Sequence, residues 1–383
     1  MRIGIDARTL SGRYTGDRTY WRGLIEGLAA VDSVNEYVLY RRLPIEGDLP
    51  VTGPNFTWRE IASPSRDALW MQMAFPKAVK SDRIDVAHTQ YNTPLFGMSC
   101  PIVTTVHDVH WMEHPEHFPA KDLATMKRFL PGSLRRACHV IAVSDSTRRD
   151  LLRHYKHHID KSKVTVTPLA AANHFQPPDG GQESARDSVN TQFGLQGRPY
   201  ILSVGVLQPR KNLRLLLDAF ALAVLGPSAL PHALVIVGKR GWGNDELDDR
   251  LRALPDAVRE RVVLTDYVPD KDLPLLYGGA DALCYPSVYE GFGLPPLEAM
   301  ACGTPVIVSN SSSLPEVVGD AGILLSASNS EPWARAMEKI GLDSLTRARW
   351  SARALERAAS FRWEHTATKT LTVYAGCVKE TNE

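Results

Sequence analysis

The sequence predicts an α/β protein made of two doubly wound domains that face a cleft. Short apolar runs alternate with amphipathic helical stretches, which is the pattern of parallel sheets covered by helices. The alternation stops once, between residues 173 and 199, and then resumes. A chain of 383 residues is also longer than one ordinary hydrophobic core supports. We therefore expect a first domain over residues 1–172 and a second over residues 200–362.

The strands are expected where short runs are rich in β-branched and aromatic residues. In the first domain these runs are Arg2–Asp6, Glu36–Tyr40, Ile84–His88, Ile102–His107, His139–Val143 and Val164–Thr167. In the second domain they are Tyr200–Gly205, Ala233–Gly238, Val262–Thr265, Ala282–Tyr285, Val306–Ser309 and Gly322–Leu325. The segment 173–199 contains Gln176-Pro-Pro-Asp-Gly-Gly-Gln and is expected to form a linker or surface loop.

Composition excludes several classes of function. The net charge of +1 does not favour binding to nucleic acid. The five cysteines are odd in number and lack CxxC spacing, which argues against a disulfide framework and a zinc site and favours a reducing compartment. The first residues are typical of a buried strand rather than a signal peptide, and no apolar run approaches the roughly 18 residues of a membrane span. We expect a cytoplasmic protein, at most attached to the inner face of a membrane.

The most informative segment lies between Glu290 and Glu298, where a strand gives way to a glycine-containing turn and then to a helix announced by Pro295 and Pro296. Backbone N–H groups at such a helix start suit a phosphate, and the flanking carboxylates suit sugar hydroxyls. The amides concerned belong to Gly291, Phe292, Gly293 and Leu294. A plain strand–turn–helix unit with one capping glutamate is the alternative, because short patterns recur by chance.

A second turn carries two adjacent cations, Arg210 and Lys211, just after the first strand of the second domain. The guanidinium can bind a diphosphate by paired hydrogen bonds and the ammonium as a point charge. Solvated surface is the alternative for such a pair. Ligands of open α/β sheets bind at the C-terminal ends of the strands, so this turn and the Glu290 turn are expected to converge on one ligand.

The stretches Ser203–Asn212 and Tyr285–Leu325 resemble glycosyltransferase family 4, the retaining nucleotide-sugar transferases with the GT-B fold of two Rossmann-like domains. Glu290 and Glu298 match its paired-glutamate motif. The resemblance implies that Arg210 and Lys211 bind the donor diphosphate and that Glu290 holds the transferred sugar with the amides of Gly291 to Leu294. It also implies that Glu298 binds the ribose hydroxyls.

The resemblance extends to three further positions. The loop with Tyr267 and Val268 stands where the family places the nucleobase, although a plain turn is the alternative. His107, at the end of an expected strand, would face the donor sugar as a catalytic residue. The alternative is that it is a structural histidine. Near the N-terminus, Gly16 fits a glycine-rich loop that approaches phosphate or acceptor, but Arg18 replaces its second glycine. Arg18 then either binds an anionic part of the acceptor or points to solvent.

The resemblance also bears on metals, partners and the end of the chain. No Asp-x-Asp pair suits a metal-bound diphosphate, so we expect metal independence and no cofactor besides the nucleotide-sugar substrate. The excess of basic residues between Lys121 and Lys163 is a candidate for contact with anionic lipid or a lipid-diphosphate acceptor. A solvated face is its alternative. The C-terminal segment, residues 363–383, resembles the family's last helix, which crosses back to the first domain, with Trp363 as a packing anchor.

The first functional interpretation is transfer of mannose from GDP-mannose to a polysaccharide or lipid-linked glycan acceptor, with retention. It depends on the similarity of Pro209–Leu213 and Tyr289–Asn310 to bacterial polysaccharide mannosyltransferases. Glucose transfer from a UDP-sugar is the nearest alternative. A nucleotide-sugar epimerase of the same fold and a catalytically silent binding module are the alternatives from other classes.

Overall fold

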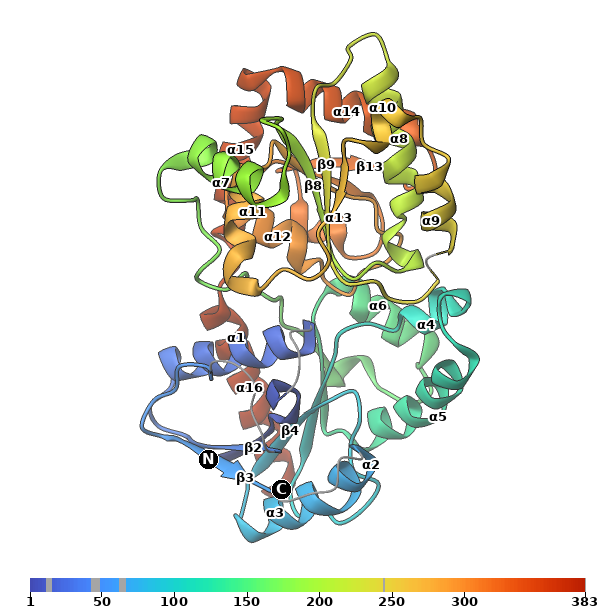
Figure 1. The fold of residues 1–383 in the computed structure, drawn as a ribbon. Helices are drawn as coiled ribbons and strands as arrows, with labels where there is room; N and C mark the ends of the chain where they lie inside the picture. The colour runs from blue at the N-terminus through green and yellow to red at the C-terminus, as the bar shows by residue number, and fades with distance from the viewer. Residues whose placement is uncertain (12–15, 43–48, 62–66, 244, 383) are drawn as a thin grey trace. The chain divides into compact units, whose positions relative to one another are not determined.

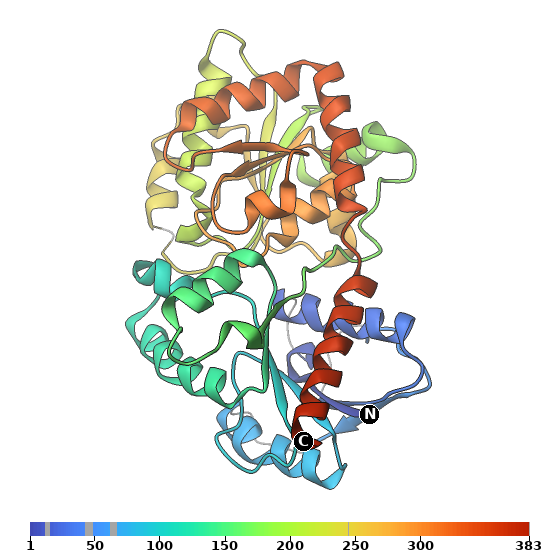
Figure 2. The same ribbon diagram turned by 180° about the vertical axis from the view of Figure 1, so that it is seen from behind.

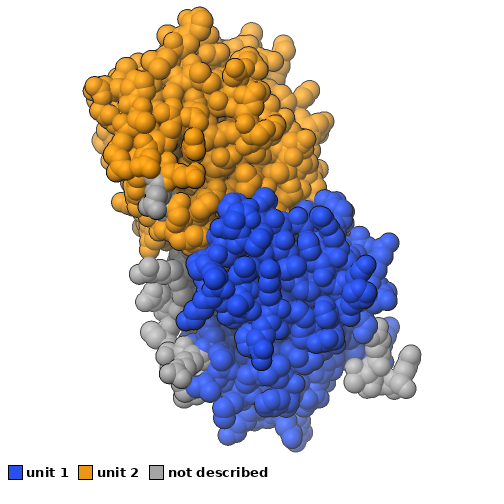
Figure 3. Space-filling view, turned by 90° about the vertical axis from the view of Figure 1, so that its right-hand side faces the viewer, with its two compact units in different colours: residues 1–170, 361–383 blue, residues 171–360 orange. Residues whose placement is uncertain are grey.

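The computed structural model describes residues 1–11, 16–42, 49–61, 67–243 and 245–382. The chain divides into two compact units, drawn in different colours in Figure 3. Unit 1 comprises Met1–Ala170 and Phe361–Glu383, and unit 2 comprises Ala171–Ser360. Each unit contains one parallel sheet with helices around it (Figure 1). The expected α/β class with two sheets is therefore confirmed.

The sheet of unit 1 has seven parallel strands in the order β3-β2-β1-β4-β5-β6-β7. The strands are β1 (Arg2–Asp6), β2 (Glu36–Arg41), β3 (Phe56–Glu60), β4 (Val86–Gln90), β5 (Ile102–Val106), β6 (His139–Ala142) and β7 (Val164–Val166). The sequence analysis missed β3, an edge strand that pairs only with β2. Its residues Phe-Thr-Trp-Arg-Glu are largely polar because an edge strand needs little buried surface.

Several helices and short turns connect these strands. They are η1 (Arg8–Ser11), α1 (Gly16–Val31), α2 (Asp67–Leu69), the π-helical turn η2 (Trp70–Ala74), α3 (Phe75–Ser81), α4 (His110–Glu113), η3 (Pro115–His117), α5 (Ala120–Arg136), α6 (Asp145–His154) and η4 (Lys161–Lys163). The last helix, α16 (Trp363–Asn382), returns to this unit. Among the described residues, no helix is both long and apolar enough to cross a bilayer.

Helix α16 packs closely against α1 (Figure 2). Two glycines of α1 allow this close approach. A Cβ atom at Gly23 would lie 2.0 Å from the Trp363 ring, and one at Gly27 would lie 2.5 Å from the Trp363 carbonyl oxygen. Trp363 is 6% exposed, so the expected packing anchor is confirmed. Further along α16, the Tyr374 hydroxyl lies 2.6 Å from Nδ1 of the buried His88 on β4.

The sheet of unit 2 has six parallel strands in the order β10-β9-β8-β11-β12-β13. The strands are β8 (Tyr200–Val204), β9 (Ala233–Val237), β10 (Val262–Leu264), β11 (Ala282–Tyr285), β12 (Val306–Ser309) and β13 (Ile323–Leu325). All six were expected within a residue of their ends. The apolar strand residues pack against α8 and α14 in a core that includes Phe220, Trp333 and Met337.

The helical elements of unit 2 surround this sheet. They are α7 (Gly181–Phe193), η5 (Pro209–Lys211), α8 (Leu213–Leu225), α9 (Asp245–Arg252), α10 (Asp256–Arg259), η6 (Asp270–Asp272), α11 (Leu273–Gly279), α12 (Leu294–Ala301), α13 (Leu314–Val318), α14 (Ser330–Leu342) and α15 (Ser344–Ala358).

The expectation of a linker or loop over residues 173–199 is wrong in its centre, because α7 occupies it. The helix buries only Ala185 and Val189, one turn apart, which is too narrow an apolar stripe to stand out in the sequence. Glycines in the left-handed conformation flank it on both sides. Arg186 anchors the helix through an ion pair with the buried carboxylate of Asp281.

Candidate active site

The two turns singled out in the sequence meet at the C-terminal ends of neighbouring strands, β8 and β11. Arg210 and Lys211 lie in η5, which follows β8, and Glu290 lies in the loop between β11 and α12. The backbone joins the turns, since the Val288 N–H donates to the Arg210 carbonyl over 2.8 Å. The predicted meeting of these two turns is confirmed, since Arg210 and Lys211 both contact Glu290.

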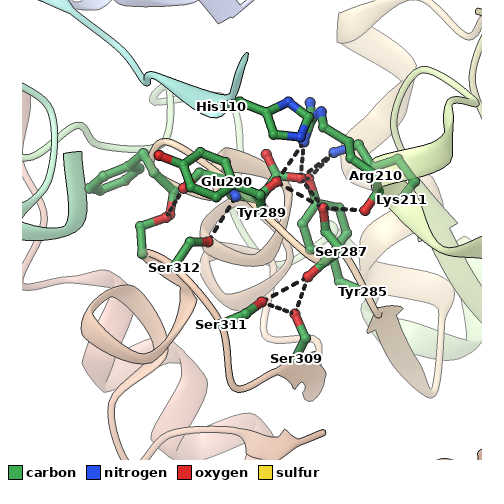
Figure 4. Close-up of polar contacts among 12 residues, drawn as sticks. His110, Arg210, Lys211, Tyr285, Ser287, Tyr289, Glu290, Ser309, Ser311 and Ser312 are labelled. Atoms are coloured by element: carbon green, nitrogen blue, oxygen red, sulfur yellow. Dashed lines mark hydrogen bonds and ion pairs between the residues drawn. The ribbon is translucent and has the colours of Figure 1, made fainter. Parts of the chain in front are cut away.

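One oxygen of the Glu290 carboxylate, Oε1, accepts from several groups at once (Figure 4). Lys211 Nζ lies 2.6 Å away, Ser287 Oγ 2.7 Å and the Tyr285 hydroxyl 2.8 Å. The Arg210 guanidinium forms an ion pair with the same oxygen. The Lys211 ammonium also donates to the Tyr285 hydroxyl. We call these five residues the Glu290 cluster.

The cluster is buried and carries an excess of positive charge. Burial raises the pKa of Glu290, but the charges of Arg210 and Lys211 outweigh it and set the pKa at about 2. Burial and the neighbouring Arg210 lower the pKa of Lys211 to about 8, against the opposing effect of Glu290. Near neutral pH two cations therefore face one carboxylate. A buried site with this excess attracts an anion such as a diphosphate.

Serines from the loop after β12 hold the backbone of the Glu290 turn. Ser312 Oγ accepts from the Glu290 N–H over 2.8 Å. Ser313 Oγ donates to the carbonyl oxygens of Glu290 at 2.9 Å and Phe292 at 2.7 Å. The turn then enters α12 through Gly293, whose φ of 107° is accessible mainly to glycine. The amides of Gly291 to Leu294 thus belong to a rigidly held turn.

The sequence analysis missed four residues of this site: Tyr285, Ser287, Ser312 and Ser313. Tyr285 is the last residue of β11, and Ser287 lies two residues beyond it. Ser311–Ser313 follow the next strand, β12. Ligands of open α/β sheets bind at the C-terminal ends of strands, and this rule, which indicated Glu290, therefore indicates these serines as well. Serines in a turn are common for local reasons, so the residue type alone does not indicate a functional site.

Glu298 lies inside α12, where only 8% of its surface is exposed, and it is not hydrogen-bonded to the Glu290 cluster in the contacts described. The Tyr277 hydroxyl donates to its Oε2 over 2.8 Å. Burial, with a smaller contribution from the charge of Asp270, raises the pKa of Glu298 to about 7 against the opposing effect of the Tyr277 hydrogen bond. Glu298 can therefore change protonation near neutral pH.

The expected nucleobase loop follows β10. Tyr267 is 45% exposed, and the Lys239 ammonium lies 5.0 Å from its ring centroid. Val268 is buried. The Asp266 carbonyl accepts from the Gly238 N–H over 2.9 Å, which ties this loop to the turn after β9. An exposed aromatic ring beside a cation is compatible with a base-binding surface.

The other expected residues belong to unit 1. His107 follows β5, with Nε2 lying 3.2 Å from Gln90 Nε2 and 3.6 Å from Asp17 Oδ1. Burial lowers its pKa, although Asp17 opposes this, so the neutral ring is favoured. Gly16 is exposed at the start of α1. Arg18 is only 3% exposed, so the alternative that it points to solvent is wrong; its position in the first turn of α1 turns it inward.

Comparison with known proteins identifies both halves of the chain. Residues 186–357 match the family model described as glycosyl transferases group 1, and residues 16–170 match that of glycosyltransferase family 4. O-antigen chain mannosyltransferase B of Escherichia coli is 36% identical over 273 residues, which are 71% of this chain and 69% of that protein.

Two solved structures share the whole fold. Sucrose-phosphate synthase from Thermosynechococcus elongatus has a TM-score of 0.74 at 21% identity, and the match covers 98% of both chains. HepE from Anabaena, solved with UDP and glucose, has a TM-score of 0.72 at 18% identity over 98% of this chain and 100% of that one. The fold and the matched halves define a glycosyltransferase of the GT-B class. Within that class the chain belongs to glycosyltransferase family 4, as its motifs indicated.

Proposed function

We propose that this glycosyltransferase moves mannose from GDP-mannose, with retention of the anomeric configuration, onto a polysaccharide or lipid-linked glycan. The observation that carries the proposal is the 36% identity to an O-antigen chain mannosyltransferase over most of the chain. The buried cationic Glu290 cluster supports the donor class, because a nucleoside diphosphate carries the charge that two cations against one carboxylate attract. A glucosyl donor such as UDP-glucose is the competing choice.

Arg210 and Lys211 are the proposed ligands of the donor diphosphate. Both cations bind Glu290 Oε1. A diphosphate would share these cations, which leaves the carboxylate available to accept from a hydroxyl of the transferred sugar. The amides of Gly291, Phe292, Gly293 and Leu294 complete the phosphate side at the start of α12. Glu298 would accept from the ribose hydroxyls, and Tyr267 and Val268 would lie beside the base.

Retention follows if the leaving group itself takes the proton. The bond between the anomeric carbon and the phosphate oxygen breaks, and the acceptor oxygen forms its bond to that carbon from the same face. The acceptor proton passes to the departing phosphate oxygen. Arg210 and Lys211 stabilise the negative charge that develops on the diphosphate. His107 and Glu290 are then positioning and electrostatic groups at the transferred sugar.

A basic surface of unit 1 is the proposed contact with the acceptor's membrane, on its cytoplasmic side. Helix α5 exposes Lys121, Lys127, Arg128 and Arg135, together with Phe129 at 45% exposure. Clustered cations beside an apolar side chain bind anionic lipid surfaces. Co-sedimentation with phosphatidylglycerol vesicles tests this contact, with phosphatidylcholine vesicles as the control. Binding that does not weaken in a Lys127→Ala, Arg128→Ala, Arg135→Ala triple variant would contradict it.

The donor is tested by calorimetric titration with GDP, UDP, GDP-mannose and UDP-glucose, followed by transfer assays with a mannan oligosaccharide. The proposal expects the tightest binding from the guanine compounds and an α-linked mannosyl product, identified by NMR. Tighter binding and faster transfer with UDP-glucose would show that the donor is not GDP-mannose. A product with the opposite anomeric configuration would contradict the proposed retention.

A further inference from the structure

Three potential metal ligands gather in the segment of unit 1 that follows β5. They are His114, Glu116 and His117, at the end of α4 and in η3. One ligand atom from each lies within 4.8 Å of the others. His114 Nδ1 is 3.0 Å from Glu116 Oε1, and His117 Nε2 is 3.9 Å from that same oxygen. The two imidazole rings are nearly parallel, with centroids 5.0 Å apart.

These separations suit a first-row transition metal. Zinc binds imidazole nitrogen and carboxylate oxygen at about 2.0–2.2 Å, which places neighbouring ligand atoms of a tetrahedron about 3.3 Å apart. The distances of 3.0 Å and 3.9 Å lie on either side of that value. Small side-chain rotations would equalise them, since Glu116 is exposed and both histidines are partly exposed. Two imidazoles and one carboxylate favour zinc over magnesium or calcium.

A neighbouring buried histidine orients one of the three. His110 is 4% exposed, and its Nε2 lies 3.0 Å from His117 Nδ1. Its ring packs against Phe118, with centroids 4.8 Å apart. When His117 Nδ1–H donates to His110 Nε2, the lone pair of His117 is on Nε2, the atom nearer to Glu116. Metal-binding histidines commonly donate their other ring N–H in this way.

We propose that His114, Glu116 and His117 bind one zinc ion, with water in the fourth position and His110 as a positioning residue. The metal would hold His114, the residue that follows α4, to Glu116 and His117 of η3, and so fix the segment between β5 and α5. The three proposed ligands, His114, Glu116 and His117, are not members of the Glu290 cluster, and the proposal does not depend on which sugar is transferred. It also revises the expectation, drawn from cysteine spacing, that the chain has no zinc site.

The experiment titrates zinc into the full chain after treatment with a chelator, using a chromophoric competitor. One equivalent should bind tightly, and cobalt in its place should give the visible absorption of a four- or five-coordinate site. His117→Gln and Glu116→Gln should each lower zinc affinity at least 100-fold. His110→Phe should lower affinity about 10- to 100-fold with the stoichiometry unchanged. His157→Gln, which changes an exposed histidine outside the proposed zinc site, should leave the zinc affinity unchanged.

Thermal melts of the metal-free variants check that each is folded, and the exposed Glu116 makes Glu116→Gln the variant least apt to disturb the fold. Equal zinc affinity in the parent and Glu116→Gln would overturn the proposal. So would loss of affinity in His157→Gln equal to that in His117→Gln, because this would indicate unspecific histidine binding. A cobalt spectrum of the fully hydrated ion would also reject the site.

Discussion

Lys211 Nζ and Glu290 Oε1 lie 2.6 Å apart, and the two side chains are only 8% and 9% exposed. Removal of one partner of a buried ion pair leaves the other charge unpaired, which costs about 3–5 kcal/mol in typical cases. Arg210 moderates this cost when Lys211 is removed, because it binds the same oxygen, whereas removal of Glu290 takes the carboxylate from both cations. Stability and ligand affinity must therefore be measured separately for every variant of this pair.

Replacing Arg210 or Lys211 by alanine should weaken GDP binding by about 1.5–3 kcal/mol, because a charged hydrogen bond to phosphate is lost. Calorimetric titration measures this, at a temperature where melts show the variant to be folded. Arg214→Ala, an exposed arginine on α8, is the matched control and should bind as the parent does. Parental affinity in both cationic variants would remove them from the donor site.

Glu290→Gln should mainly lower turnover. The amide keeps the size of the side chain but gives Lys211 and Arg210 a weaker acceptor and no negative charge, so affinity for GDP should hold or improve. Steady-state transfer assays separate kcat from KM. Parental turnover in this variant would show that Glu290 has no part in the reaction.

Glu298 should make stability depend on pH with a definite sign. Burial raises its pKa from 4.5 to about 7, so between these values the folded chain keeps a proton that the unfolded chain has released. The stability contributed by this group is complete below pH 4.5 and is lost as pH rises through 7, by at most about 1.4 kcal/mol per unit. Denaturant unfolding of the parent and Glu298→Gln measures it. The parent should lose stability relative to the variant over that range, and a constant difference would contradict the shift.

His107→Ala should lower turnover while GDP affinity and the melting temperature change little. The contrast is His88→Ala, which removes a fully buried ring bonded to Tyr374 and Thr105. That variant should lose a few kcal/mol of stability with turnover per folded molecule intact. Thermal melts and transfer assays on both variants distinguish a catalytic His107 from a structural one. If His107→Ala instead behaves like His88→Ala, His107 is structural.

Gly27→Ala should destabilise the protein by about 1–3 kcal/mol, because the new Cβ would lie 2.5 Å from the Trp363 carbonyl oxygen. Gly376→Ala is the control on α16, where no atom lies within 4 Å of an added Cβ. It should be neutral or stabilise by up to about 1 kcal/mol. Equal melting temperatures for the two variants would refute tight packing at Gly27.

Transfer should continue after exhaustive chelation, since Arg210 and Lys211 supply the positive charge at the diphosphate. The assay belongs well below the melting temperature, so that loss of a structural metal does not unfold unit 1. Parallel samples with zinc or magnesium restored are the controls. Activity that disappears with EDTA and returns with magnesium would require a metal at the donor.

The sheets were predictable because buried parallel strands are continuous apolar runs, as in Ala233–Val237. Edge strand β3 and helix α7 were not, because each buries too few side chains to leave a clear period in the sequence. In both cases partners distant in the chain supply the stability. Arg186 of α7, for example, is held by Asp281.

The meeting of Arg210, Lys211 and Glu290 could be predicted because both turns follow the C-terminal ends of strands in one sheet. Tyr285 and Ser287 could not be predicted, since a tyrosine at a strand end and a serine in a turn are ordinary. The pKa values of Glu290 and Glu298 also could not be foreseen. Both are buried glutamates of the same motif, yet one has cations beside it and the other has Tyr277 and the charge of Asp270.

The return of α16 to unit 1 orders events during synthesis. Residues 171–360 form one continuous stretch, so unit 2 can complete its fold without α16. Unit 1 has all seven strands of its sheet by then, but Gly23 and Gly27 of α1 stay uncovered until α16 has been made. A chain truncated after residue 360 and released should therefore contain a protease-resistant unit 2 beside a protease-sensitive unit 1.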